Sequence, residues 1–180
     1  MTLEENKNKT IIMIVAQEGF RDEELLETKE VLDECGFTTI IASQREGECK
    51  GKLGAVVEAN LSINEIELTD DVVAIVVIGG PGSPDLMKVD ELGVLLRKTI
   101  EKNLVLGAIC YAPAVVASFG VIDGRNATCY ADDFSIPIFK EHKILFIDEL
   151  VVADDKLITG NGPSAAKAFG EEICKTLEEE

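Results

Sequence analysis

The 180-residue chain has no tryptophan, two tyrosines and one histidine, and it sets only 17 Lys and Arg against 34 Asp and Glu. The formal net charge of −17 opposes binding to nucleic acid backbones and to anionic membrane surfaces. No run of about 18 uncharged apolar residues is present, so we expect no membrane-spanning helix. The start, MTLEENKNKT, lacks the basic and apolar segments of a signal peptide. These absences predict a cytoplasmic protein that binds neither nucleic acid nor membrane.

The cysteines form no C-x-x-C pair, and their number is odd. This usage predicts reduced thiols rather than a disulfide framework or a zinc site. The one histidine, His142 in the charged segment FKEHKILF, further limits metal and Cys/His chemistry, and we expect it to be solvated. No metal or cofactor is therefore expected. The five cysteines are Cys35, Cys49, Cys110, Cys129 and Cys174.

Apolar runs alternate with amphipathic stretches along the chain, whose length fits one domain over residues 1–180. The runs predict strands, and the amphipathic stretches, several bounded by glycine or proline, predict helices. We expect strands at 10–16, 37–43, 72–80, 104–109 and 126–130, and helices at 21–36, 87–103, 111–120 and 163–180. The whole pattern predicts an α/β sandwich with a parallel sheet and right-handed crossovers.

Two further segments have the glycines and polar breaks of short strands and turns. Residues 49–66 predict small strands, and residues 150–160 predict a hairpin that turns at Asp154 and Asp155. The run VVAIVVIGG, residues 72–80, is apolar throughout, which is typical of a central strand buried on both faces. Such sheets bind ligands at the carboxyl ends of their strands.

Cys110 lies where the predicted strand LGAI passes directly into the predicted helix YAPAVV. A cysteine on such a turn exposes its sulfur near unpaired helix N–H groups, which favour the thiolate. The alternative is a buried core thiol, since free cysteine is among the most buried residue types. Cys129 is a further thiol that could resolve an oxidised Cys110 as a disulfide.

The segment GGPGSP, residues 79–84, lacks the Lys-Ser/Thr ending of a P-loop. It is either a plain turn or a source of backbone N–H donors for an oxyanion beside Cys110. Glu24 lies in an acid-rich first helical turn, where a carboxylate also serves the helix dipole on the surface. Spacing alone does not decide between a surface and a catalytic role for Glu24.

These motifs, in their order and gaps, resemble the DJ-1/PfpI superfamily from Thr10 to the last helix. The resemblance is carried by FRDEEL, VVIGG, GAICYAP, GRNATCY and VVADDKLITGNGPSAAKAFG. It implies a flavodoxin-like three-layer sandwich with a central, mostly parallel sheet and a nucleophile elbow. It also implies a homo-oligomer, dimeric or larger.

The resemblance implies a role for several residues of the site. Cys110 is then the nucleophile, and Glu24, the second acid of the family's E-x-x-E, is its partner. The backbone N–H groups of Gly80 and Tyr111 form the oxyanion hole. A protonated Glu24 would donate to a thiolate or to an oxidised sulfur without adding negative charge.

Several positions depart from the family pattern. Arg21 replaces the first acid of the E-x-x-E. Tyr111 replaces the elbow histidine of the PfpI-like branch, and Pro84, next to Asp85, stands where a neighbouring subunit supplies a glutamate. Tyr130, which could orient substrate or carry a proton, takes the position of the DJ-1 branch's histidine, but a phenol is a poor base at neutral pH. A Cys-His-acid peptidase would therefore lack its base.

We expect a protein that acts on small reactive aldehydes, of the glyoxalase or deglycase type, through the Cys110 thiolate and Glu24. The second hypothesis is a redox sensor or protective protein whose Cys110 is oxidised to the sulfinic acid without turnover. Its partners would then be a small aldehyde or an oxidant. An intracellular PfpI-like cysteine peptidase ranks third. A glutamine amidotransferase is disfavoured because His142 does not stand in the required relation to an acid.

Overall fold

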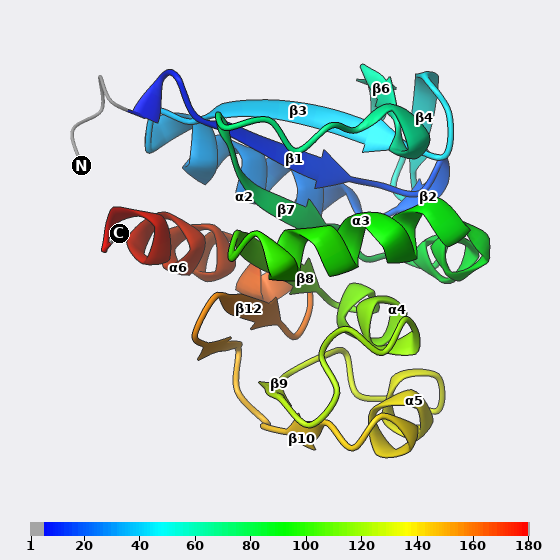
Figure 1. Cartoon of the computed structure of the whole chain (residues 1–180). Helices are drawn as coiled ribbons and strands as arrows, with labels where there is room; N and C mark the ends of the chain where they lie inside the picture. Colours follow the sequence, from blue (N-terminus) through cyan, green and yellow to red (C-terminus); the bar gives the residue numbers. More distant parts are fainter. Residues whose placement is uncertain (1–5, 180) are drawn as a thin grey trace.

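The computed structural model of the chain describes residues 6–179. Residues 1–5 and Glu180 lie outside this range. They belong to the segment predicted to hold no signal peptide and to the end of the last predicted helix, respectively. A seven-stranded sheet in the order β11-β12-β8-β7-β1-β3-β6 forms the centre (Figure 1). All its neighbouring strands are parallel except β11 and β12. The strands are β1 (Thr10–Ile14), β3 (Thr38–Ser43), β6 (Leu61–Ser62), β7 (Val72–Val77), β8 (Val105–Ile109), β11 (Val151–Asp154) and β12 (Leu157–Gly160).

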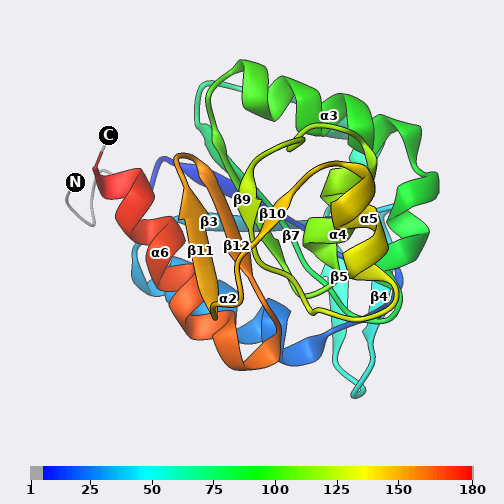
Figure 2. The ribbon, with the colours of Figure 1, turned by 90° about the horizontal axis from the view of Figure 1, so that it is seen from below.

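Helices cover both faces of this sheet (Figure 2). The helices α2 (Asp22–Glu34) and α6 (Ala166–Glu178) lie on one face, and α3 (Asp90–Glu101) and α4 (Ala112–Ser118) lie on the other. Side chains of β1 alternate between the two layers, because successive residues of a strand point to opposite faces. Ile11 and Met13 pack with α2 and α6, and Ile12 and Ile14 pack with α3 and α4. This arrangement confirms the predicted flavodoxin-like three-layer sandwich.

Short elements complete the fold. They are β2 (Glu18–Phe20), β4 (Gly47–Gly51) and β5 (Val56–Ala59) in a small sheet, β9 (Asn126–Ala127) paired with β10 (Leu145–Phe146), and the 3₁₀ turns η1 (Ile63–Glu65), η2 (Ser83–Lys88) and η3 (Pro163–Ala165). Within residues 6–179 no helix is long and apolar enough to cross a lipid bilayer.

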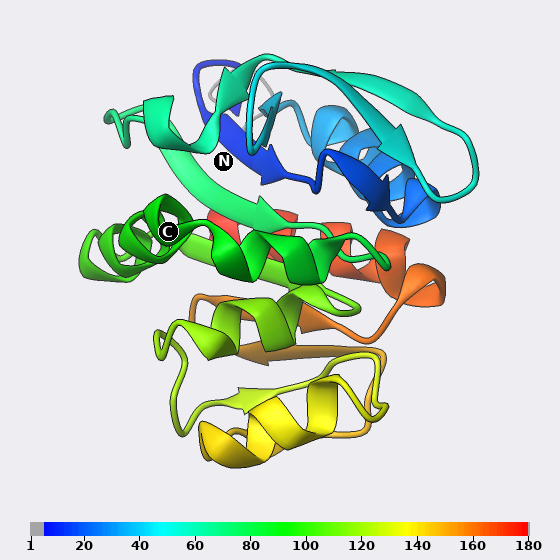
Figure 3. The same ribbon diagram turned by 90° about the vertical axis from the view of Figure 1, so that its right-hand side faces the viewer.

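Three local expectations were wrong. The helix α5 (Ser135–Glu141) was not predicted. Just before it, Asp132 Oδ1 accepts the N–H groups of Phe134 and Ser135 at 2.9 and 3.0 Å. Figure 3 shows α5, in yellow, at the opposite end of the sheet from β3, in cyan. The predicted strand 126–130 is regular only over β9. The β11–β12 hairpin turns one residue later than predicted, because Asp154 still pairs with Leu157.

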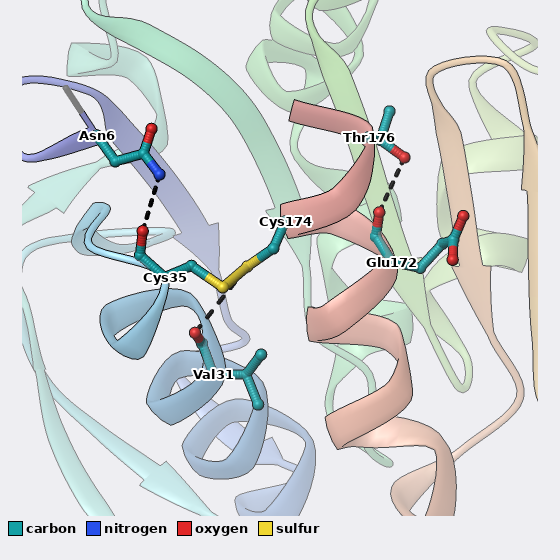
Figure 4. The surroundings of a disulfide bond; sticks show 6 residues. All are labelled: Asn6, Val31, Cys35, Glu172, Cys174 and Thr176. Atoms are coloured by element: carbon teal, nitrogen blue, oxygen red, sulfur yellow. Dashed lines mark hydrogen bonds between the residues drawn. A yellow bond between two sulfur atoms is a disulfide. The ribbon is translucent and has the colours of Figure 1, made fainter. Parts of the chain in front are cut away.

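The prediction of five reduced thiols was also wrong. Cys35, after the C-terminal end of α2, forms a disulfide with Cys174 on α6 (Figure 4). The two helices pack side by side and bring the Cα atoms to 6.5 Å, within the usual range for a disulfide. The residues are 139 positions apart, so their spacing gave no sign of the pairing. The remaining thiols, Cys49, Cys110 and Cys129, are free and buried.

Candidate active site

Cys110 forms the turn between β8 and α4, with a backbone φ of 65°. This left-handed conformation is uncommon for a residue with a side chain, and its cost, about 1–3 kcal/mol, is typical of strained positions at functional sites. The turn is fixed on both sides, because Cys110 N donates to Gly160 O at 2.8 Å and Tyr130 N donates to Cys110 O at 2.9 Å. The residue keeps 7% of its surface exposed, at the floor of a pocket. The predicted nucleophile elbow is therefore present in the backbone.

The double glycine after β7 lies against this turn. A Cβ on Gly79 would come within 2.6 Å of Cys110 Cβ and 2.7 Å of Glu24 Oε2, so only glycine fits. Gly80 has a φ of +106°, which other residues rarely adopt. The backbone N–H groups of Gly80 and Tyr111 both interact with the Cys110 sulfur. The structure thus brings together the two N–H donors expected for an oxyanion hole.

Glu24 enters the same site from the first turn of α2 and is fully buried. Its Oε2 accepts the N–H of Gly79 at 3.1 Å, and its carboxyl group interacts with the Cys110 thiol. Its Oε1 is buried without a hydrogen-bond partner in the described part of the chain. Burial raises the pKa of Glu24 to about 7, although Cys110, Gly79 and Arg21 act in the opposite direction. Glu24 therefore holds a proton in a substantial fraction of molecules at neutral pH.

Burial also raises the pKa of the Cys110 thiol, and the negative charge of Glu24 raises it further. The N–H groups of Gly80 and Tyr111 lower it, but they do not outweigh burial. This differs from the expectation that the elbow alone favours the thiolate. When Glu24 is protonated, its repulsion disappears and the two N–H donors remain. A Cys110 thiolate is therefore less unfavourable beside a neutral Glu24 than beside a charged one.

The sulfur opens into a pocket of about 440 Å³. The structure brings the predicted residues Arg21 and Tyr130 to its wall, and Tyr130 is 48% exposed. Asp85 lies outside this pocket and pairs with Lys88 at 2.7 Å on η2. The lining residues are Arg21, Glu24, Lys52, Gly80, Pro81, Cys110, Tyr111, Tyr130 and Pro163.

Tyr111, at the position of the family's histidine, donates its hydroxyl hydrogen to Asp132 Oδ2 at 2.6 Å. This hydrogen bond, with burial, raises the pKa of Tyr111 to about 12. The ring lies edge-to-face with Tyr130 and Phe134, at centroid distances of 5.6 and 5.2 Å. Tyr111 is therefore a fixed, protonated phenol and supplies no base at neutral pH.

Two residues of the site were missed from the sequence. Lys52, in the turn directly after β4, lines the pocket, and Asp132 orients Tyr111. The glycines around Lys52 predicted a tight turn, but nothing in the sequence indicated that this turn lies beside the Cys110 pocket. Two other candidates, His142 and Cys129, do not line the Cys110 pocket. His142 pairs with Asp123 at 2.9 Å, and Cys129 faces a separate cavity of about 250 Å³.

The fold and the site define a class of α/β sandwich proteins with a cysteine on a strained strand-to-helix turn, a buried carboxyl partner and backbone donors at the sulfur. Residues 9–176 match the DJ-1/PfpI family. The chain therefore belongs to the DJ-1/PfpI family.

Its relatives include an uncharacterized protein of Methanocaldococcus jannaschii, 36% identical over 97% of this chain and 85% of that protein. The glutathione-independent glyoxalase DJR-1.2 of Caenorhabditis elegans is 28% identical over 94% of this chain and 89% of its own. A deglycase of Thermococcus kodakarensis is 29% identical over 92% of this chain and 98% of its own. The crystal structure of a ThiJ/PfpI domain protein from Brachyspira murdochii has the same fold, with a TM-score of 0.89 at 24% identity, over 95% of this chain and 97% of that one.

Proposed function

We propose that the protein converts small 2-oxoaldehydes such as methylglyoxal to 2-hydroxy acids, as a glyoxalase or deglycase, with Cys110 as nucleophile and Glu24 as proton carrier. The observation that carries the proposal is the buried carboxyl of Glu24, with a pKa of about 7, in contact with Cys110. A group that titrates near neutral pH can both give and take a proton. Relatives named as a glyoxalase and as a deglycase share most of the chain length with this protein.

The proposed reaction begins when the Cys110 thiolate adds to the aldehyde carbon and the carbonyl oxygen becomes an oxyanion. The N–H groups of Gly80 and Tyr111 hold this oxygen, and Glu24 gives it a proton. The Glu24 carboxylate then removes the proton from the former aldehyde carbon, which forms an enediolate, and returns it to the neighbouring carbon. The hydroxyl proton on the former aldehyde carbon moves to the oxygen of the neighbouring carbon. The product is a thioester of Cys110 with lactate. Water hydrolyses it, so that methylglyoxal and one water molecule give lactate and the free thiol.

The first prediction concerns lactate formation by the purified protein. We expect methylglyoxal to be converted to lactate, with no activity in Cys110→Ser because the nucleophile is lost. We expect at least a hundredfold lower kcat in Glu24→Gln, since general acid–base groups contribute about 10²–10⁴-fold. Lactate is measured enzymatically, and Asp85→Asn, outside the pocket, serves as the control variant.

Absence of lactate with pure wild-type protein would contradict this function. If graded peroxide then converted Cys110 alone to the sulfinic acid, the redox-sensor hypothesis would take its place. Casein hydrolysis that depends on Cys110 would instead restore the peptidase hypothesis. Tyr130 as an orienting residue, the homo-oligomer and the cytoplasmic location stay predictions.

A further inference from the structure

The wall of the Cys110 pocket has a charge opposite to that of the whole protein. Arg21 and Lys52 are its two cationic side chains, and Glu24 is its one carboxyl group. Glu24 is fully buried in the floor beside the sulfur, whereas the side chain of Lys52 is exposed. The pocket that contains Cys110 is therefore lined by two cations, although the chain as a whole carries a net charge of −17.

The backbone around Lys52 is fixed by specific hydrogen bonds. Lys52 N donates to Phe20 O at 2.8 Å. The N–H groups of Leu53 and Ala55 donate to the two oxygens of the buried Asp22 at 2.8 and 2.7 Å. Asp22 neighbours Arg21 at the start of α2, so one helix end positions both pocket cations. The location of Lys52 at the pocket is built into the fold rather than the result of a loose surface loop.

The two cations differ in how far nearby acids compensate them. Arg21 Nε and Nη2 bind Glu23 at 2.8 and 3.1 Å, which leaves Nη1 without a partner among residues 6–179. The buried carboxylate of Asp22 is occupied by the N–H groups of Leu53 and Ala55. Over the same residues, no carboxylate pairs with the Lys52 ammonium, whereas Lys50, two residues earlier on β4, pairs with Glu48 at 3.2 Å. Lys52 is therefore the main uncompensated charge at the pocket.

We infer that Lys52, assisted by Arg21, binds a carboxylate of the substrate, so that the pocket selects 2-oxoaldehydes that carry a carboxylate over uncharged ones such as methylglyoxal. This inference rests on the proposed function for its turnover. A suitable probe is 4,5-dioxopentanoate, which has the aldehyde and ketone at one end and a carboxylate at the other. The reaction proposed above would add one water molecule to it and give 2-hydroxyglutarate. The pocket volume of about 440 Å³ accommodates five carbons.

The experiment that tests the charge preference needs no turnover. Iodoacetate and iodoacetamide alkylate the same thiolate and release iodide, but only iodoacetate is an anion. The rate of each reaction at Cys110 is measured by mass spectrometry, and the ratio of the two rates removes any change in thiolate fraction. We expect Lys52→Met to lower the iodoacetate-to-iodoacetamide ratio about two- to fivefold, the size expected for loss of an exposed charge pair. The matched control, Lys50→Met, should leave the ratio unchanged, because Lys50 lies outside the pocket.

An unchanged ratio in Lys52→Met, or an equal fall in Lys50→Met, would overturn the inference whatever the protein's catalytic activity. The second measurement compares kcat/KM for 4,5-dioxopentanoate with kcat/KM for methylglyoxal. We expect wild type to favour the anionic substrate and Lys52→Met to reduce that preference mainly through KM. If the alkylation ratio falls in Lys52→Met as expected but neither substrate gives product, the proposed function is wrong and the anion site remains supported. If both substrates are converted and Lys52→Met shows the same preference between them as wild type, the anion site is wrong and the proposed function remains supported.

Discussion

Glu24 and Cys110 occupy one buried space, in which a negative charge on either side chain is unfavourable. The pKa of Glu24 is raised from 4.5 to about 7 chiefly by burial. A raised carboxyl pKa means that the folded state favours the protonated form. The contribution of Glu24 to stability is thus fully present below pH 4.5 and is lost as the pH rises through about 7.

This linkage predicts how Glu24→Gln changes stability. Glutamine is neutral at every pH, so the variant should gain stability relative to wild type as the pH rises from about 5 to about 8. The difference in free energy of unfolding between Glu24→Gln and wild type should change by about 3 kcal/mol at most over this pH range. Urea unfolding at both pH values measures it, and Glu30→Gln, exposed on the same helix, is the control. If the free energy of unfolding changed with pH in the same way in Glu24→Gln and in wild type, the pKa of Glu24 would not be raised by folding.

The sequence located the site only in part, for reasons that differ among residues. Cys110 was found because an apolar strand and a helix meet at that residue. Glu24 was found only through the family resemblance, since an acid in a first helical turn is ordinary on a surface. Lys52 was missed because its position depends on Asp22 accepting two N–H groups more than 30 residues away in the sequence. Asp132 was missed because its contact with Tyr111 spans 21 residues, which include α4, β9 and the loops around them.

At the scale of elements, α2 links the site to the rest of the fold. Its first turn carries Glu24, and its C-terminal end is joined to α6 through Cys35 and Cys174. Thr28, between these points, donates to Ala166 O at the start of α6 at 3.1 Å. The central strands and flanking helices could be predicted because their apolar periodicity is local. The disulfide could not, since it depends on the packing of two helices at opposite ends of the chain.

The disulfide predicts a stability that depends on redox conditions. Cross-linking residues 139 positions apart restricts the unfolded chain, and its loss should lower the free energy of unfolding by about 2–4 kcal/mol. Guanidinium unfolding with and without dithiothreitol measures this difference. The double variant Cys35→Ser/Cys174→Ser should match the reduced wild type and show no response to the reductant. If dithiothreitol lowered the free energy of unfolding equally in wild type and in the double variant, the effect would not come from the Cys35–Cys174 disulfide.

For the whole molecule, the net charge of −17 and the cationic pocket act on an anionic reagent in opposite directions. The overall charge repels an anion from a distance, whereas Lys52 attracts it near the sulfur. Salt weakens both effects, but exposed charges farther apart than the Debye length, about 10 Å at 0.1 M, are screened most completely. The salt dependence of a reaction at Cys110 therefore separates the long-range from the local contribution.

We expect the rate of Cys110 alkylation by iodoacetate to rise with added salt in Lys52→Met. The remaining pocket cation, Arg21, is paired with Glu23, so screening of the overall repulsion is then the larger effect. In wild type the rise should be smaller or reversed, since salt also weakens the attraction to Lys52. Iodoacetamide, which is uncharged, corrects for any effect of salt on the thiolate itself. Equal salt slopes for iodoacetate in the two proteins would mean that Lys52 adds no local attraction. In that case the −17 charge alone would govern how anions approach the site.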